Sequence, residues 1–189
     1  MPAPLPVDLY AILDRSVAGN RPLREILDGI IAGGGRLVQL REKEWSVRQC
    51  LPLASELRRL AKESGVTFIV NDRLDLALAV EADGLHVGQD DLPAPVARRL
   101  LGPGRLLGVS THSVEQAVQA QADGADYVAI GSIYQTSTKT NFELVGLEML
   151  RAVRSQFVPS KIVLFRPADE NLPEIIRFAK FTESYGAIN

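Results

Sequence analysis

The sequence has little of what several large classes of protein depend on. It holds one cysteine, Cys50, and two histidines among its 189 residues, which excludes an internal disulfide framework and a clustered zinc site. No apolar run reaches the roughly 18 residues of a membrane span, and the N-terminus lacks the basic and apolar regions of a secretory signal. The 21 Lys and Arg against 23 Asp and Glu give no basic field for nucleic acid. We expect a cytoplasmic protein without nucleic-acid or membrane partners.

Short apolar runs instead alternate with amphipathic stretches along the whole chain. The runs are rich in Val, Ile and Leu and are apolar nearly throughout, as parallel strands buried on both faces are. They cover 9–13, 36–41, 67–72, 84–89, 106–111, 127–133 and 161–165, with a weak eighth candidate at 184–188. Helical patterns over 22–32, 46–64, 74–81, 93–101, 113–123 and 144–157 lie between them.

This alternation predicts βαβ units and a parallel sheet, closed as a (β/α)₈ barrel or open and doubly wound. Polar clusters follow almost every strand, and only a barrel brings all of these strand ends to one mouth. We therefore predict one TIM-barrel domain over residues 1–189. Such barrels rarely have fewer than about 200 residues, so a chain of 189 residues is small for eight βα units.

Three groups at the predicted mouth suggest chemistry. Gln39 and Arg41 face the same way on one strand and Lys43 follows them, which favours an anion site, although a solvated cluster with Glu42 pairing Lys43 is the alternative. Asp72 follows one strand and Asp90 and Asp91 follow its neighbour, so that a carboxylate from each could share a divalent cation, although Asp72 and either Asp90 or Asp91 also suit a helix N-cap. The loop 131–139 combines hydroxyls with Lys139, which suits phosphate or a plain polar surface.

Other residues indicate packing, and several familiar catalytic motifs are missing. Cys50 and Trp45 are predicted to pack in the interior, and His86 is predicted to be a hydrogen-bonded histidine inside the barrel. The chain has no Walker A loop, nucleophile elbow or dinucleotide fingerprint, so nothing supports acyl hydrolysis or NAD chemistry.

Five motifs together resemble the thiamine-phosphate synthase (thiamine-phosphate pyrophosphorylase) family. They are QLREK at 39–43, ND at 71–72, DGLHVGQDD at 83–91, GVSTHS at 108–113 and DYVAIGSIYQTSTK at 126–139, within a resemblance that covers roughly residues 8–156. The resemblance implies a (β/α)₈ barrel and a Mg²⁺-dependent transferase. Its substrates would be hydroxymethylpyrimidine diphosphate and hydroxyethylthiazole phosphate, and its products thiamine phosphate and pyrophosphate. Departure of pyrophosphate would leave a stabilised pyrimidine cation, which the thiazole nitrogen then attacks.

The resemblance also implies a role for each matching residue. Asp72 and Asp91 would hold Mg²⁺, and Gln39 and Tyr10 would help to seat the pyrimidine. The diphosphate would be bound by Arg41, Lys43, Asn71 and Lys139, and the thiazole phosphate by Thr136 and Thr138. Ser110 would lie near the leaving group, and the catalytic set would be Arg41, Lys43, Ser110 and Lys139.

The chain departs from the family pattern after about residue 157, so the seventh and eighth units of the barrel are expected to be atypical or incomplete. No glycine occurs between Gly146 and Gly186, where the family has a Gly-Gly-Ile segment for the thiazole phosphate, and Arg166 is the candidate substitute anion ligand. Two other readings stay open: an isomerase like the thiazole tautomerases, and a ligand-binding relative without catalysis. The family also implies a homodimer.

Overall fold

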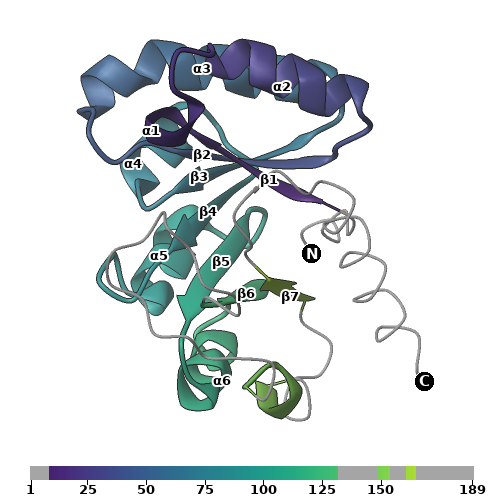
Figure 1. The fold of residues 1–189 in the computed structure, drawn as a ribbon. Coiled ribbons are helices and arrows are strands. Elements are labelled where there is room, and N and C mark those ends of the chain that lie inside the picture. The colour runs from purple at the N-terminus through teal and green to yellow at the C-terminus, as the bar shows by residue number, and fades with distance from the viewer. Residues whose placement is uncertain (1–8, 132–148, 154–160, 165–189) are drawn as a thin grey trace.

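Seven parallel strands form one sheet in the computed structural model, which describes residues 9–131, 149–153 and 161–164. The strands lie side by side in the order of the sequence, as they do in a barrel (Figure 1). They are β1 (Tyr10–Asp14), β2 (Leu37–Arg41), β3 (Thr67–Asn71), β4 (Gly84–Val87), β5 (Leu106–Thr111), β6 (Tyr127–Ile130) and β7 (Lys161–Leu164). The parallel α/β fold is confirmed, and the predicted eighth strand at 184–188 lies outside the described residues.

Helices follow the strands and cover the outer face of the sheet. They are α1 (Arg15–Ala18), α2 (Leu23–Ala32), α3 (Val47–Glu63), α4 (Leu74–Ala79), α5 (Ala94–Leu101) and α6 (Val114–Ala122). Residues 149–153 are also helical and belong to the helix predicted over 144–157, the rest of which lies outside the described residues. Except for α1, which follows β1 directly, the helices α2 to α6 were each predicted to within about two residues. None of the described helices is long and apolar enough to cross a membrane.

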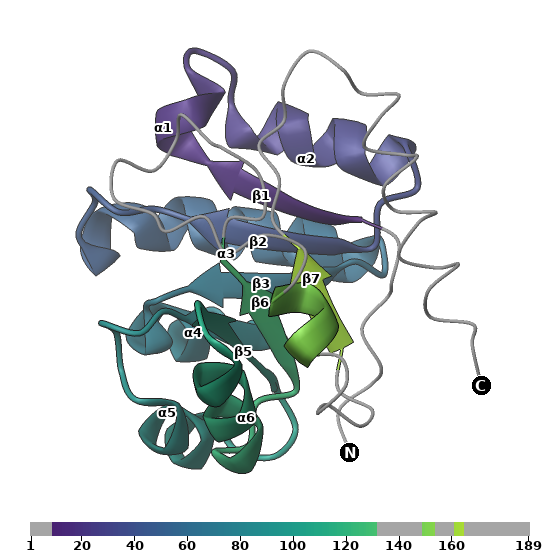
Figure 2. The ribbon, with the colours of Figure 1, turned by 60° about the horizontal axis from the view of Figure 1, so that its bottom comes forward.

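The sheet is curled, as Figure 2 shows, and side chains from distant strands meet inside it. Tyr10 of β1 and Tyr127 of β6 are 117 residues apart, yet their hydroxyl oxygens are 2.8 Å apart. Successive side chains on a strand face opposite ways, so the register pairs Ile12 with Gln39 and His86 with Gly108 on the inner face. The inner face therefore carries the polar pattern of the predicted site.

Two apolar clusters stabilise this arrangement. The larger lies between the sheet and the helices, where Leu13, Phe68, Leu85 and Val128 pack against the helices. The smaller lies inside the curl, where Tyr127 packs with Leu37, Ile69 and Leu106. Burial of apolar surface on both faces explains why these strands are apolar nearly throughout.

The long helix α3 illustrates how local sequence sets the boundaries. Ser46 and Gln49 form a capping box, with Ser46 N–H donating to Gln49 Oε1 over 3.0 Å. Cys50 and Leu57 are fully buried on its inner side, as the packing prediction for Cys50 required. Pro52 removes one backbone hydrogen bond but lies on the exposed side, and the helix continues through it unbroken.

Two aspartates connect the amino-terminal ends of the strands to the helices in the same way. Asp83, just before β4, accepts the Phe68 N–H over 2.8 Å and binds Arg58 of α3 with both carboxylate oxygens. Asp126, just before β6, accepts the Leu107 N–H over 2.7 Å and pairs with Arg98 of α5. Each aspartate thus satisfies a backbone donor at the start of the preceding strand.

We expect Asp83→Ala to lower the free energy of unfolding by about 2 kcal/mol, because it leaves the buried Phe68 N–H and the Arg58 guanidinium without their acceptor. Urea unfolding followed by circular dichroism measures the change. Asp28→Ala is the matched control, since Asp28 is exposed on α2 and its loss should change stability by less than about 0.5 kcal/mol. Equal losses in both variants would contradict this role for Asp83.

Candidate active site

The carboxyl ends of the strands, which we call the mouth, carry most of the residues singled out by the sequence. Asp14 and Arg41 are register partners at the ends of β1 and β2, and their side chains form an ion pair. Asp14 also accepts the Ser16 N–H over 2.9 Å and so caps α1. Burial acts to raise the pKa of Asp14, but the hydrogen bonds from Ser16 and Arg41 outweigh it and hold that pKa below its usual value. Arg41 is therefore held in place by a carboxylate.

Lys43 pairs with Asp72 across the mouth. The alternative interpretation, with Glu42 pairing Lys43, is wrong for the described contacts, because Glu42 binds Arg15 instead. The Lys43 side chain is half exposed, whereas that of Asp72 is only 14% exposed. A half-exposed ammonium therefore pairs with a largely buried carboxylate.

Asp72 and Asp91 hydrogen-bond to each other, although they come from different strand ends. Asp72 has a φ of 62°, a left-handed conformation uncommon outside glycine, asparagine and aspartate, and its N–H donates to His86 O over 2.7 Å. Asp91 Oδ2 accepts the Gly88 N–H over 2.7 Å. Neither aspartate caps the helix after it, since Arg73 and Pro93 are the N-cap residues.

The two carboxyl groups have their pKa values driven apart. Burial and the neighbouring Asp91 raise the pKa of Asp72, against the opposing effect of Lys43. Burial also acts on Asp91, but hydrogen bonds from Asp72 and Gly88 outweigh it and lower the pKa of Asp91. Two carboxylates this close repel each other when both are ionised, and a divalent cation between them removes that repulsion. The pair therefore fits a cation such as Mg²⁺, which commonly uses one or two carboxylates with water and substrate phosphate.

The loop after β2 is held in place by the largely buried side chain of Glu42. Its side chain is 6% exposed and accepts Arg15 Nε over 2.6 Å and the backbone N–H of Glu44 over 2.7 Å. Arg15 lies over the Trp45 ring, 4.7 Å from its centroid. Trp45 is half-buried against the larger core, so its predicted packing role is confirmed. These contacts fix the segment that carries Lys43.

We expect Glu42 to contribute stability that is lost in acid. Burial acts to raise its pKa, but hydrogen bonds from Glu44, Arg15 and Trp45 outweigh it, so the pKa of Glu42 lies below its usual value. A carboxyl whose pKa is lower in the folded state contributes stability above its unfolded pKa, and loses it as the pH falls through the folded pKa. The free energy of unfolding should therefore fall between about pH 5 and pH 3, and less steeply in Glu42→Gln.

Urea unfolding at a series of pH values measures this slope. Glu25→Gln serves as the control, because Glu25 is exposed on α2 and the variant should keep the wild-type slope. A Glu42→Gln variant with the wild-type slope would contradict the contribution assigned to Glu42.

A chain of side-chain hydrogen bonds runs beneath the mouth through five strands. Gln39 Nε2 donates to Tyr10 Oη over 2.7 Å, and Tyr10 Oη is 2.8 Å from Tyr127 Oη. His86 Nδ1 lies 3.1 Å from Tyr127 Oη, and His86 Nε2 lies 2.9 Å from Ser110 Oγ. The predicted role of His86 as a hydrogen-bonded barrel histidine is confirmed, and the hydrogen bonds join three predicted substrate residues, Gln39, Tyr10 and Ser110.

The predicted site residues thus divide into those that come together and those outside the described part. Gln39, Arg41, Lys43, Asp72, Asp91 and Ser110 meet at or beneath the mouth, Tyr10 joins them from β1, and Asn71 is buried at the end of β3. Thr136, Thr138, Lys139 and Arg166 lie outside the described residues. The sequence analysis missed Tyr127 as a polar link and Asp14 as the partner of Arg41. The second could have been found from the predicted register of the first two strands.

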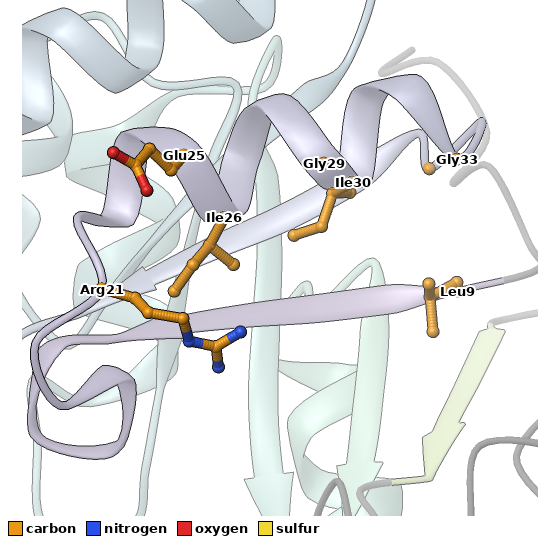
Figure 3. A pocket seen from close by; sticks show the side chains of 8 residues that line it. Leu9, Arg21, Glu25, Ile26, Gly29, Ile30 and Gly33 are labelled. Atoms are coloured by element: carbon orange, nitrogen blue, oxygen red, sulfur yellow. The ribbon is translucent and has the colours of Figure 1, made fainter.

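A surface cavity of about 480 Å³ lies away from this site, between α2 and β1 (Figure 3). It is bordered by Ile26 and Ile30 of α2, by Leu9 before β1, and by the charged residues Arg21 and Glu25. None of the residues that line it belongs to the mouth. The cavity therefore takes no part in the chemistry of the mouth.

Comparison with known proteins gives one consistent result. A family model described as thiamine monophosphate synthase matches residues 9–168. A thiamine-phosphate synthase of Moorella thermoacetica is 53% identical over 149 residues, which are 78% of this chain and 71% of the relative. A thiamine-phosphate synthase of Chloroflexus aurantiacus is 50% identical over 147 residues, 77% of this chain and 68% of the relative.

Solved structures agree with these matches. Thiamine phosphate pyrophosphorylase from Pyrococcus furiosus is similar with a TM-score of 0.77 at 31% identity, over 92% of this chain and 81% of that chain. An N-acetylmannosamine-6-phosphate 2-epimerase from Clostridium perfringens has a TM-score of 0.63 at 15% identity, which supports the fold alone.

Proposed function

The chain belongs to the thiamine monophosphate synthase family, and from this premise we propose that it joins hydroxymethylpyrimidine diphosphate to hydroxyethylthiazole phosphate. It is a transferase of thiamine biosynthesis that acts on small molecules and makes thiamine phosphate. The proposal adds the two substrates, Mg²⁺ as the metal and a role for each residue at the mouth. One observation carries it: the carboxyl pair of Asp72 and Asp91 lies beside the cation Lys43, at the strand ends where Arg41 is held by Asp14.

The arrangement of charges suits a diphosphate bound together with a cation. Asp72 and Asp91 would hold Mg²⁺, which when bound neutralises charge on the diphosphate and makes it a better leaving group. Lys43, now paired with Asp72, has a flexible and half-exposed side chain that can turn to the diphosphate oxygens when the metal takes its place. Arg41 keeps its orientation through Asp14 and presents its remaining donors to the same anion.

The reaction breaks one bond and forms one bond. The carbon–oxygen bond between the pyrimidine methylene and the diphosphate breaks, and its electron pair leaves with pyrophosphate. The thiazole nitrogen then donates its lone pair to the methylene carbon, which becomes part of a thiazolium cation. No protein nucleophile is needed. The chain contributes by holding both substrates, by neutralising the leaving group through Arg41 and Lys43, and by a hydrogen bond from Ser110.

The remaining assignments belong to the same proposal. Gln39 and Tyr10 seat the pyrimidine, Asn71 and Lys139 bind the diphosphate, and Thr136 and Thr138 bind the thiazole phosphate. A cytoplasmic location, which the single cysteine favours, and a homodimer complete it. Light scattering of the purified protein at several concentrations tests the dimer.

The direct test is to incubate the purified chain with both substrates and Mg²⁺ and to quantify the products by chromatography. We expect thiamine phosphate and pyrophosphate in equal amounts, with formation abolished when Mg²⁺ is removed by a chelator. No product from folded protein at saturating substrate would overturn the proposal.

The same protein distinguishes the two alternatives. Isomerisation of a thiazole carboxylate phosphate without any pyrimidine substrate would favour the tautomerase-like activity, and ligand binding without turnover would favour a non-catalytic relative. The paired Asp72 and Asp91 argue against the tautomerase-like activity, which needs no diphosphate and metal set at the mouth, whereas the altered C-terminal sequence is the feature that favours a non-catalytic relative.

A further inference from the structure

His112, the second of the two histidines in the chain, is placed very differently from His86. Both ring nitrogens of His86 lie within hydrogen-bond distance of buried or partly buried hydroxyl groups. The His112 side chain is only partly buried, and neither of its ring nitrogens has a hydrogen-bond partner among the residues that the structure describes. An imidazole always carries at least one N–H donor, so this ring has a donor available to a bound molecule.

The strand alternation places the His112 side chain on the inner face of the sheet, at the mouth. Ser110 points inward, because its Oγ is 2.9 Å from His86 Nε2, and Thr111 is fully buried on the opposite face. His112 directly follows β5 and is two residues beyond Ser110, so the two side chains face the same way. His112 therefore lies above Ser110, nearer to the opening of the mouth.

A glycine on the neighbouring strand makes room for this ring. The register pairs Thr111 with Ile130, so that Gly131, which directly follows β6, is the neighbour of His112. A Cβ atom on Gly131 would lie 2.5 Å from His112 Cδ2 and 3.0 Å from His112 Nε2. The ring therefore lies over the backbone of Gly131, and any side chain there would displace it.

The backbone around the ring is held on both sides. The His112 N–H donates to Gln116 Oε1 over 2.7 Å, and the Gly131 N–H donates to Thr111 O over 2.7 Å. Thr111 Oγ1 also donates to Ala129 O over 3.2 Å, which joins β5 to β6 a second time. The imidazole thus projects from a fixed backbone, as a residue that positions a ligand requires.

The charges at the mouth indicate which ligand the ring meets. Arg41, Lys43, Asp72 and Asp91 come from β2, β3 and β4 or from the loops that follow them, so the diphosphate and its metal are assigned to that side. The β5 and β6 side remains for the other substrate, which brings a phosphate of its own. No lysine or arginine occurs between residues 106 and 131, so His112 is the one side chain of that segment that can carry a positive charge.

We propose that His112 is a substrate-contacting residue, seated by Gly131, whose imidazole N–H donates to the phosphate of hydroxyethylthiazole phosphate. The identity of this ligand rests on the proposed function. The placement of the ring over Gly131 at the mouth does not.

Calorimetry of two ligands with the same variants tests the contact. His112→Phe keeps a planar ring without nitrogen, and it should weaken binding of hydroxyethylthiazole phosphate about tenfold, the effect of losing a hydrogen bond to a charged group. His112→Gln, which restores an N–H, should recover most of that affinity. Binding of pyrophosphate with Mg²⁺ should stay within about twofold of the wild type in both variants, because its ligands lie on the other side of the mouth. Unchanged thiazole phosphate binding in His112→Phe, or a loss confined to pyrophosphate, would overturn the proposal.

A mutant cycle tests the part assigned to Gly131. Gly131→Ala should displace the ring and weaken hydroxyethylthiazole phosphate binding about as much as His112→Ala does. In the double variant the added methyl group meets no imidazole, so the affinity should be no lower than in His112→Ala alone. Additive losses would overturn the proposal that Gly131 acts by seating this ring.

Proton NMR observes the contact without turnover, since the chain has only two histidines. The ring-proton signals of His112 are assigned by their loss in His112→Phe. They should shift when the wild-type protein is saturated with hydroxyethylthiazole phosphate, and shift less with pyrophosphate and Mg²⁺. Signals that stay unchanged at saturating thiazole phosphate would reject the contact.

These measurements separate the inference from the proposed function. If the chain made no thiamine phosphate but bound thiazole phosphate through His112, the proposed function would fail and the inference would stand. If the chain were an active synthase whose thiazole phosphate affinity did not depend on His112, the inference would fail and the function would stand.

Discussion

Replacing Asp72 or Asp91 with asparagine is expected to lower kcat/KM for thiamine phosphate formation by roughly 1,000-fold, the size of effect seen when one charge-stabilising group is removed. The two carboxyl groups share a hydrogen bond and lie where a cation would meet the diphosphate. Asparagine has the same shape but no charge, so it preserves packing and removes the attraction for Mg²⁺. It also tolerates the left-handed backbone at Asp72, which alanine would strain.

Asp90→Asn is the matched control for both variants. Asp90 is the immediate neighbour of Asp91 but is exposed, so its loss should leave the rate within about twofold of the wild type. A steady-state assay over a Mg²⁺ titration measures the effect, and calorimetry with Mn²⁺ and pyrophosphate gives a second readout that needs no turnover. Either variant retaining full activity at limiting Mg²⁺ would disprove the metal role of that residue.

Asp72 is proposed to hold Mg²⁺ and also pairs with Lys43, so its replacement removes both interactions. The Lys43→Met variant removes only the ion pair and so distinguishes the two. Removing the ammonium should slow the reaction but leave the Mg²⁺ concentration for half-maximal rate nearly unchanged. Asp72→Asn should raise that concentration strongly. The same shift in both variants would mean that the Asp72 carboxylate acts mainly by holding Lys43.

The fold could be predicted from the sequence because each strand and helix is recognised from residues that are neighbours in the chain. Each strand is rich in Val, Ile and Leu, and helices begin and end at residues with a known preference, such as the Ser46 cap of α3. The same pattern predicts the mouth, since strand ends in a barrel converge, and Arg41 ends β2, Asp72 directly follows β3 and Asp91 lies in the loop after β4. These inferences need no knowledge of which strands touch across the barrel.

The partners of those residues could not be predicted in the same way. The contact between Tyr10 and Tyr127 joins the first strand to the sixth, and it depends on how tightly the sheet curls. Within the run at 127–133, Tyr127 has the same local pattern as any buried apolar residue, so nothing marks its hydroxyl as a link. The pairing of Lys43 with Asp72 rather than Glu42 likewise depends on a loop geometry that Glu42 itself fixes from beneath.

Gly108→Ala is expected to lower the free energy of unfolding by ~3 kcal/mol, and the melting temperature by roughly 10 °C. The added Cβ would collide with the Tyr127 ring and crowd the His86 imidazole, and all three groups are buried between paired strands. Interiors packed at crystal density give way only by straining rotamers or moving backbone. Thermal and urea unfolding of the purified variant measure the change.

Gly104→Ala is the matched control, because nothing lies within 4 Å of a Cβ built there and Gly104 is exposed. It should leave stability within about 0.5 kcal/mol of the wild type or raise it slightly, since alanine has fewer unfolded conformations than glycine. Both variants include the general effect of replacing glycine with alanine on the free energy of unfolding. The difference between them therefore measures the cost of the collision inside the barrel.

A second substitution tests whether the collision with Tyr127 is the cause. Tyr127→Val makes room for the new methyl group, so Gly108→Ala should cost much less in that background than in the wild type. The two substitutions should also be coupled in function, because either one breaks the hydrogen bond between Tyr127 and His86. If Gly108→Ala destabilised both backgrounds equally, the strain would have to arise from the backbone of β5 rather than from the tyrosine. The glycine would then have no special part in holding His86.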